Sequence, residues 1–186
     1  VDMTTPGTDV CGQASRALSL MYLNYRNTDS GYANQCLQSA QQLYDLARAN
    51  MGQTTCDFYK SSSHYDDLAW AAVWLAVATG DNSYLDPVDG YLDEKNNYGD
   101  DNYDKHWAPA WDDVVLFAML KMAQLTENFK YMYGVQNNLR WYEEECQQTP
   151  GGLPWLDSWG VLRYASAEAG LGFMASKLIG INFYND

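Results

Sequence analysis

The sequence predicts an all-α protein whose antiparallel helical hairpins form part of an α/α toroid. Three observations support this fold class. Apolar residues recur at helical spacing, no segment alternates between apolar and polar residues as a strand would, and segments that are apolar on most faces alternate with amphipathic ones. A helix that is apolar all round is buried, so the pattern indicates inner helices covered by outer ones. An open helical solenoid is the alternative arrangement.

Seven helices are expected, at residues 9–26, 32–50, 65–79, 82–94, 110–126, 129–146 and 161–179. Segments 65–79 and 110–126 are apolar on most faces and are predicted to be inner helices, whereas segment 32–50 is amphipathic and is predicted to be an outer one. Three long loops separate the hairpins, at residues 51–64, 95–109 and 147–160. These loops are expected at one end of the hairpins, where functional residues usually lie.

A loose internal repeat supports the hairpins. The short turns that end in Tyr32, Tyr84 and Tyr131 resemble one another, and these tyrosines are 52 and 47 residues apart. Thr, Asp or Asn just before a periodic segment is typical of a helix N-cap, in which the side-chain oxygen accepts a backbone N–H. Related segments at the opposite ends of the hairpins are expected to open apolar helices, at Tyr65, Trp111 and Trp159.

Composition restricts the possible partners. The net charge of −13 repels phosphate backbones and opposes docking on anionic lipid, so neither nucleic acid nor a membrane surface is expected as a partner. The longest apolar stretch, residues 68–78, is about half the length needed to cross a bilayer. The length of 186 residues is typical of a single region, residues 1–186.

The four cysteines are scattered without a pair or a histidine at zinc-ligand spacing, which makes a zinc site improbable. They permit either two disulfides or four thiols: Cys11, Cys36, Cys56 and Cys146. The sequence also lacks a Ser-His-Asp arrangement, a P-loop and a G-x-G-x-x-G motif, so acyl transfer and nucleotide binding have no support.

Aromatic residues are in excess, with seven Trp and fifteen Tyr, and many fall in the long loops together with acids. Most aromatic rings in a protein belong to its core, but exposed rings also stack on sugar rings, and carboxylates accept hydrogen bonds from hydroxyl groups. The loop face therefore suits a neutral polyol polymer. His64 and His106 each lie beside an aromatic residue in these loops and could hydrogen-bond to a ligand, but two isolated histidines do not predict a metal site.

Paired carboxylates occur at two predicted helix starts, Asp66–Asp67 and Asp112–Asp113. One interpretation is stabilisation of the helix dipole by ~0.3–1 kcal/mol for each acid. The other is contact with a substrate or a metal at the base of the groove. The acidic stretch 86–104 and the run 143–145 are interpreted as solvated faces.

A family resemblance rests on several motifs in order: residues 6–10 (PGTDV), 58–59 (FY), 65–74, 78–85, 111–113 (WDD), 149–153 (TPGGL) and 156–165 (LDSWGVLRYA). Together they resemble the middle part of the catalytic domain of family 9 glycoside hydrolases. These are endo-β-1,4-glucanases, or cellulases, built on an (α/α)6 barrel. The resemblance covers nearly all of the 186 residues.

The resemblance implies hydrolysis of internal β-1,4-glucosidic bonds with inversion, in a secreted, extracellular protein whose ligand is a β-1,4-glucan or cello-oligosaccharide. It assigns Tyr59, Trp107, Trp159 and Tyr164 to aromatic subsites, and Asp112 and Arg163 to polar groups that hold sugar hydroxyls. We therefore expect a substrate-binding set made of these residues with two additions from the loop analysis: Tyr59, Trp107, Asp112, Trp159, Arg163, Tyr164, His64 and His106.

Two departures from the family pattern concern catalysis and binding. The family's catalytic Asp base and Glu acid match regions before Val1 and after Asp186, so no catalytic residue is expected within the chain, and the missing remainder of the barrel or a second copy is expected as a partner. A subsite Trp of the family is replaced by Ser62.

The family's calcium site is also altered. The Asp of its Tyr-x-Asp-Glu sequence is Asp67 here, but the Glu is replaced by Leu68. Asp67 and Asp112 remain as metal-ligand candidates for a structural calcium ion, and no cofactor is required. The alternatives are a non-catalytic glucan-binding or structural extracellular relative, and another toroid enzyme with a different polysaccharide.

Overall fold

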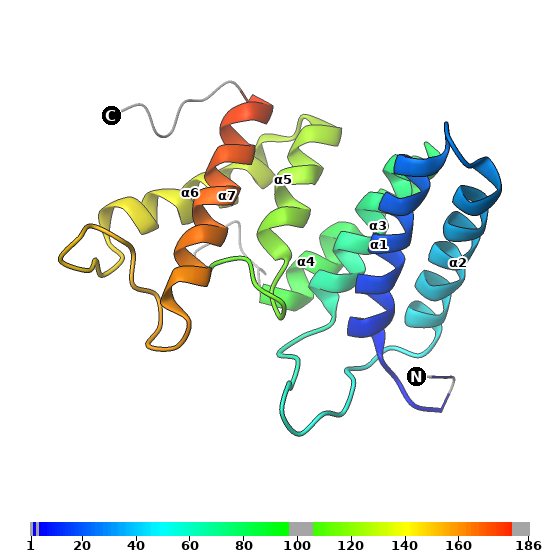
Figure 1. Ribbon diagram of the computed structural model, residues 1–186, viewed down its shortest axis with the longest axis horizontal. Coiled ribbons are helices and arrows are strands. Elements are labelled where there is room, and N and C mark those ends of the chain that lie inside the picture. Colours follow the sequence, from blue (N-terminus) through cyan, green and yellow to red (C-terminus); the bar gives the residue numbers. More distant parts are fainter. Residues whose placement is uncertain (1, 3, 97–105, 180–186) are drawn as a thin grey trace. The chain divides into compact units, whose positions relative to one another are not determined.

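The computed structural model describes residues 2, 4–96 and 106–179, in which the regular secondary structure is helical (Figure 1). Contacts group the chain into two compact units, residues 1–97 and 98–186. Unit 1 contains α1 (Thr8–Tyr25), α2 (Ser30–Ala49), α3 (Tyr65–Thr79), the short 3-10 helix η1 (Asn82–Leu85) and α4 (Val88–Asn96). Unit 2 contains α5 (Val115–Thr126), α6 (Phe129–Glu144) and α7 (Val161–Ile179). The prediction of a single domain over residues 1–186 stays a prediction.

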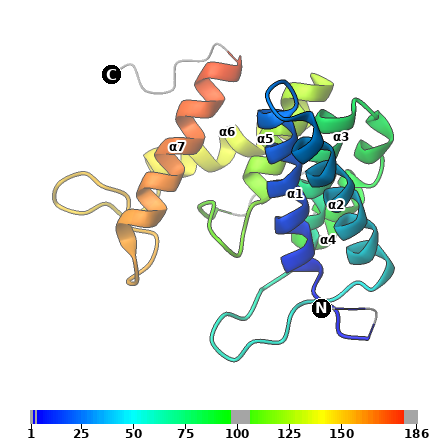
Figure 2. The same cartoon turned by 45° about the vertical axis from the view of Figure 1, so that its right-hand side comes forward.

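In unit 1, small residues let α1 pack closely against α2 and α3 (Figure 2). The hydroxyl of Ser15 on α1 donates to the backbone carbonyl of Ala40 on α2 at 2.8 Å, and both residues are fully buried. Gly12 faces α3, and a Cβ at this position would lie 2.8 Å from the backbone oxygen of Asp67. The approach of α1 to α3 therefore depends on a residue without a side chain.

The inner and outer characters predicted for α3 and α2 are confirmed within unit 1. α3 is buried on most of its faces, and Leu68, Val73 and Leu75 are inaccessible to solvent. α2 buries one stripe, which includes Ala33, Cys36, Ala40, Tyr44 and Ala47. α3 ends at Gly80, whose positive φ of 74° lets its N–H reach the carbonyl of Ala76 at 2.8 Å.

The three repeated turns perform the capping that their sequences predict. Asp29 accepts from the N–H of Tyr32 at 3.0 Å, and Asp81 accepts from the N–H of Ser83 at 2.9 Å. Asn128 accepts from the N–H of Lys130 at 3.1 Å. Each oxygen satisfies a backbone donor that the first turn of a helix leaves unpaired.

Two predicted helices are wrong at their N-terminal ends. The helix expected at 82–94 is divided by Pro87, because proline has no N–H to continue a helical hydrogen-bond pattern. α4 starts just after it, and the carbonyl of Pro87 accepts from Tyr91 at 3.1 Å. The helix expected at 110–126 starts only at residue 115. Ala110 and Asp113 close a tight turn through two backbone hydrogen bonds of 2.8 and 3.3 Å, so Trp111 precedes the helix instead of opening it.

Unit 2 is held together by contacts among α5, α6 and α7. α5 is largely buried, as predicted for an inner helix. A separate small core at the start of α7 comprises Ala108, Tyr142, Cys146 and Tyr164. α7 also exposes an apolar face, here called the α7 apolar face, made of Leu162, Phe173, Met174 and Leu178.

The cysteines and the helix lengths complete the description. All four cysteines are thiols rather than disulfides, with Cys56 exposed and the other three buried. Within the described ranges, no helix combines the length and the apolar character needed to cross a bilayer.

Candidate functional site

Three of the expected substrate-binding residues meet in unit 2 at the start of α7. The rings of Trp107 and Tyr164 lie edge to face with their centroids 5.5 Å apart. The Arg163 guanidinium donates to the Tyr164 hydroxyl at 2.6 Å and lies over the same ring, 4.5 Å from its centroid. Tyr164 is buried while Trp107 and Arg163 are exposed, so a buried phenol supports two accessible groups. We call these three residues the Trp107 cluster.

A glycine sets the position of Arg163. Gly160 has a positive φ of 66°, and its carbonyl accepts from the Arg163 N–H at 2.9 Å. A Cβ on Gly160 would lie 2.9 Å from Arg163 Nε, so the arginine side chain folds back over a residue that offers no obstruction. The preceding Trp159 is 77% exposed, which leaves most of its ring available for stacking.

Two further expected residues of unit 2 lie near this region but play different parts. His106 stacks on Trp141 of α6, with centroids 4.8 Å apart and an interplanar angle of 4°. This contact anchors the segment that carries Trp107. Asp112 lies in the tight turn before α5 and is partly buried, so it does not occupy the first turn of a helix as predicted. The carboxylate that serves the helix start is Asp113, which accepts from the N–H of Val115 at 3.2 Å.

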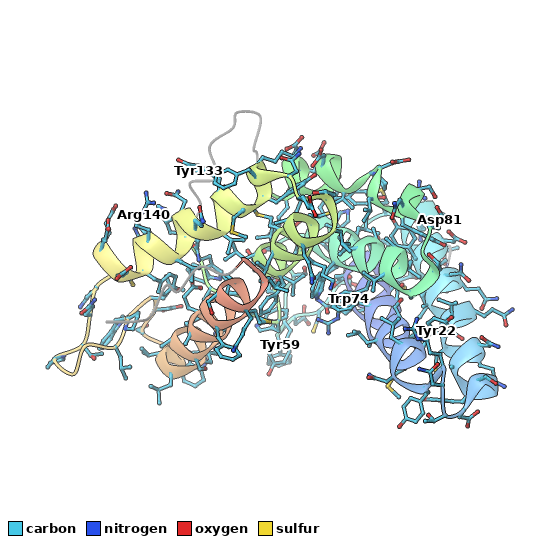
Figure 3. All side chains as sticks on the ribbon, turned by 90° about the horizontal axis from the view of Figure 1, so that it is seen from above. Tyr22, Tyr59, Trp74, Asp81, Tyr133 and Arg140 are labelled. Atoms are coloured by element: carbon cyan, nitrogen blue, oxygen red, sulfur yellow. The ribbon has the colours of Figure 1, made fainter. Side chains whose placement is uncertain are left out.

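The remaining expected residues, Tyr59 and His64, belong to unit 1. Tyr59 is 70% exposed on the loop between α2 and α3, and its ring is labelled in Figure 3. His64 precedes α3, and its ring stacks on Tyr65 with centroids 4.4 Å apart. Burial lowers the pKa of His64, which favours the neutral ring. Tyr98 and Tyr103, further aromatic residues of the second loop, lie outside the described residues.

Beneath the loop of unit 1 lies a buried ion pair that sequence analysis missed. The ammonium of Lys95 on α4 lies 3.5 Å from the carboxylate of Asp66, and both side chains are at most 2% exposed. Lys95 also donates to the hydroxyl of Ser62 at 3.3 Å. The neighbouring Asp67 accepts from the amide of Gln13. Burial, together with the charge of Asp66, raises the pKa of Asp67 to about 9.

Comparison with known proteins identifies the family. The model of glycosyl hydrolase family 9 matches residues 1–185. The chain belongs to this family. It is 32% identical to Endoglucanase 4 of a Bacillus species (strain KSM-522) over 94% of its own length. It also superposes on the solved structure of the cellulase Cel9M of C. cellulolyticum with a TM-score of 0.90 and 38% identity, over 97% of its own length.

The relatives are much longer than this chain. It spans 29% of Endoglucanase 4 and 42% of the Cel9M structure. A second Cel9M structure, in complex with cellobiose, has a TM-score of 0.90 and 40% identity, and the match covers 95% of this chain and 41% of that one. Family 9 cellulase structures have an (α/α)6 barrel fold, so the predicted fold class is confirmed in preference to the solenoid.

The donor set does not fit the calcium ion that family 9 membership led us to expect. The side chain of Leu68 is fully buried and has no oxygen to offer, while Lys95 places a positive charge beside Asp66. Calcium takes six to eight oxygen ligands. Within residues 2, 4–96 and 106–179, no three His, Cys, Asp or Glu side chains gather as a metal site would require.

Sequence analysis also missed a buried polar pair in unit 2. Asn138 on α6 and Glu168 on α7 are 1% and 2% exposed, and the Asn138 amide donates to Glu168 Oε1 at 2.8 Å. Burial raises the pKa of Glu168 to about 8, although the hydrogen bond from Asn138 opposes the shift. A usable signal was present, because each residue interrupts an otherwise apolar helix stripe: Val135, Leu139 and Tyr142 flank Asn138, and Tyr164 and Leu171 flank Glu168.

Proposed function

We propose that this chain is the substrate-holding part of an endo-β-1,4-glucanase that hydrolyses internal bonds of cellulose-type glucans with inversion. The observation that carries the proposal is the Trp107 cluster, in which an exposed indole and an exposed guanidinium share a buried phenol. An indole face stacks on the C–H surface of a glucose ring. The guanidinium offers five N–H donors in a fixed plane, which suits the hydroxyl groups of the same sugar.

The same groups favour a ligand that is a chain of sugars and carries no charge. Trp107 and Trp159 are both accessible aromatic rings of unit 2. Two rings favour a chain of sugars over a monosaccharide, because each ring adds an independent stacking contact. The net charge of −13 would repel an anionic polysaccharide. Neutral aromatic rings and an uncharged β-1,4-glucan agree with this charge.

Binding tests the proposal directly. Isothermal titration of the purified protein with cellohexaose is expected to give measurable affinity, which falls about tenfold in Trp107→Ala, corresponding to ~1.4 kcal/mol. Phe129→Ala is the control, because Phe129 is an aromatic residue even more accessible than Trp107 (68% against 36% exposed) at the start of α6, outside the site. Equal loss in both variants, or binding that neither variant changes, would refute the assignment.

Hydrolysis is a separate part of the proposal. The acid and base are expected in parts of the protein beyond these 186 residues, so the purified chain by itself should not release reducing sugar from carboxymethylcellulose. The full-length protein should do so, and the first product should have the α-anomeric configuration that inversion of a β-bond produces. Binding without hydrolysis by the full-length protein would instead support the non-catalytic glucan-binding alternative.

The partner and location follow from the same proposal. The remainder of the barrel would cover the α7 apolar face, since an exposed apolar surface tends to find a partner or to associate. Self-association of the chain is the alternative. It would appear as an apparent molecular mass that rises with protein concentration, and Phe173→Asp should reduce this rise.

A polymeric glucan cannot enter a cell, so an extracellular, secreted protein is proposed. Recovery of the protein in the culture medium tests this.

We also propose that no cofactor is required. Support comes from the residues around Asp66, where a lysine already neutralises the carboxylate. Chelation with EDTA should therefore leave glucan binding unchanged.

A further inference from the structure

Asn138 occupies a position in unit 2 where it contacts two structural elements at once. Its side-chain oxygen accepts from the backbone N–H of Trp107 at 3.1 Å. Its side-chain nitrogen donates to Glu168 Oε1 at 2.8 Å. Because this one side chain both accepts and donates, the orientation of its amide is fixed. In the reversed orientation, the amide nitrogen would face the Trp107 N–H and the amide oxygen would face Glu168 Oε1.

These contacts lie in a place where polar groups are unfavourable. Asn138 and Glu168 are almost completely buried, and the second carboxyl oxygen of Glu168 has no hydrogen-bond partner within the described part of the chain. Apolar residues of similar volume could occupy both positions without the cost of removing water from polar groups. Replacing both partners of a buried polar pair in this way is often neutral or stabilising. Stability alone is therefore a weak reason for this pair.

What the pair does hold is the backbone at Trp107. Residues 106–109 form neither helix nor strand, so secondary structure does not fix this segment. His106 stacks on Trp141 on one side, and buried Ala108 anchors the other. Trp107 lies between them, and its backbone N–H donates to the Asn138 side chain.

We infer that Asn138, oriented by Glu168, is a positioning residue that holds Trp107 in place as a sugar-stacking surface. The inference rests on the proposed function and adds a specific role for two residues outside the Trp107 cluster. Neither residue touches the glucan. They act through the backbone of Trp107 and the ring contact between Trp107 and Tyr164.

The test is a double-mutant cycle in the purified protein, with cellohexaose as the probe. Asn138→Leu keeps the number and branching of the heavy side-chain atoms and removes both hydrogen bonds, so affinity should fall about five- to tenfold. In a Trp107→Ala background the same change should have no further effect, because the ring it positions is gone. A purely structural role predicts equal losses in both backgrounds, and that result would overturn the inference.

Glu168 provides a matched pair of variants. Glu168→Gln keeps an oxygen that accepts from Asn138 and should bind cellohexaose within twofold of the unchanged protein. Glu168→Leu removes the acceptor and should resemble Asn138→Leu. Equal affinity in the two Glu168 variants would overturn the orienting role. If Asn138→Leu does not fold, Asn138→Ala, which also removes both hydrogen bonds and adds no volume, replaces it in the cycle with the same expected loss.

A second readout separates this inference from the proposed function. Acrylamide quenching of tryptophan fluorescence measures the exposure of the Trp107 indole. Its contribution is the difference in quenching between a protein with Trp107 and its Trp107→Ala variant, and this difference is measured with and without the Asn138 change. A shift in that difference supports positioning, and no shift opposes it. If Trp107→Ala weakens binding but the Asn138 variants do not, the inference alone fails. If the unchanged protein does not bind cellohexaose, the proposed function fails and the inference fails with it.

Discussion

The two units bury carboxyl groups beneath their aromatic loops in different ways. In unit 1, Asp66 has a lysine ammonium 3.5 Å away, so a charge is matched by an opposite charge. In unit 2, Glu168 accepts a hydrogen bond from the neutral amide of Asn138, and burial raises its pKa to about 8. A buried acid can therefore be accommodated either by a neighbouring cation or by surroundings that favour its neutral form.

The ion pair of unit 1 should give the largest effect on stability. Lys95→Met leaves Asp66 buried without its cation and should lower the free energy of unfolding by ~3–5 kcal/mol. Urea denaturation measures it. Adding Asp66→Leu should recover most of the loss, because the uncompensated charge is then removed. If Lys95→Met is as stable as the unchanged protein, the ion pair contributes nothing to stability.

The neutral carboxyl of unit 2 should make stability depend on pH. Glu168 has a folded pKa of about 8 against an ordinary value of 4.5, so between these values the folded state binds more protons than the unfolded state. The contribution of this group to the free energy of unfolding is therefore fully present below pH 4.5. It is lost as the pH rises toward 8, by at most ~1.4 kcal/mol per pH unit.

Glu168→Gln should flatten this part of the pH profile, as measured by urea denaturation at several pH values. Asp67, whose pKa is raised to about 9, acts in the same direction, so the slope should decrease without disappearing. An unchanged slope in the Gln variant would mean that Glu168 is ionised in the folded protein.

Close packing in unit 1 gives the next largest effect. Gly12→Ala places a methyl group 2.8 Å from the backbone of Asp67, so α1 must move away from α3, at an expected loss of ~1–3 kcal/mol. Gly170→Ala is the matched control in unit 2, because a Cβ there meets nothing within 4 Å. The control should stabilise α7 by ~0.5–1 kcal/mol. Thermal denaturation of both variants checks the contrast, and equal effects would contradict it.

The smallest expected effect concerns calcium. If Lys95 supplies the positive charge beside Asp66, millimolar calcium should leave the Tm unchanged, because a ligand raises stability only when it binds the folded state. Differential scanning calorimetry with calcium and with EDTA measures this. A clear rise in Tm with calcium would show that oxygen ligands gather there despite Leu68.

Local chemistry made much of this structure predictable from the sequence. The caps formed by Asp29, Asp81 and Asn128 depend only on residues two or three positions away, and the burial of α3 follows from its lack of a polar face. The family resemblance likewise pointed to Trp107, Arg163 and Tyr164, which the structure brings together. The start of α5 was missed because the turn at Ala110–Asp113 depends on backbone bonds that compete with a helix.

The sequence by itself determined the helical hairpins, their caps and the family, because these depend on periodicity, neighbouring residues and linear motifs. Only the tertiary structure decided which polar groups became partners. Lys95 is 29 residues from Asp66, and Glu168 is 30 residues from Asn138. Interactions of this kind depend on distance in space and on the loss of water around both groups, and neither quantity is written in the order of the residues.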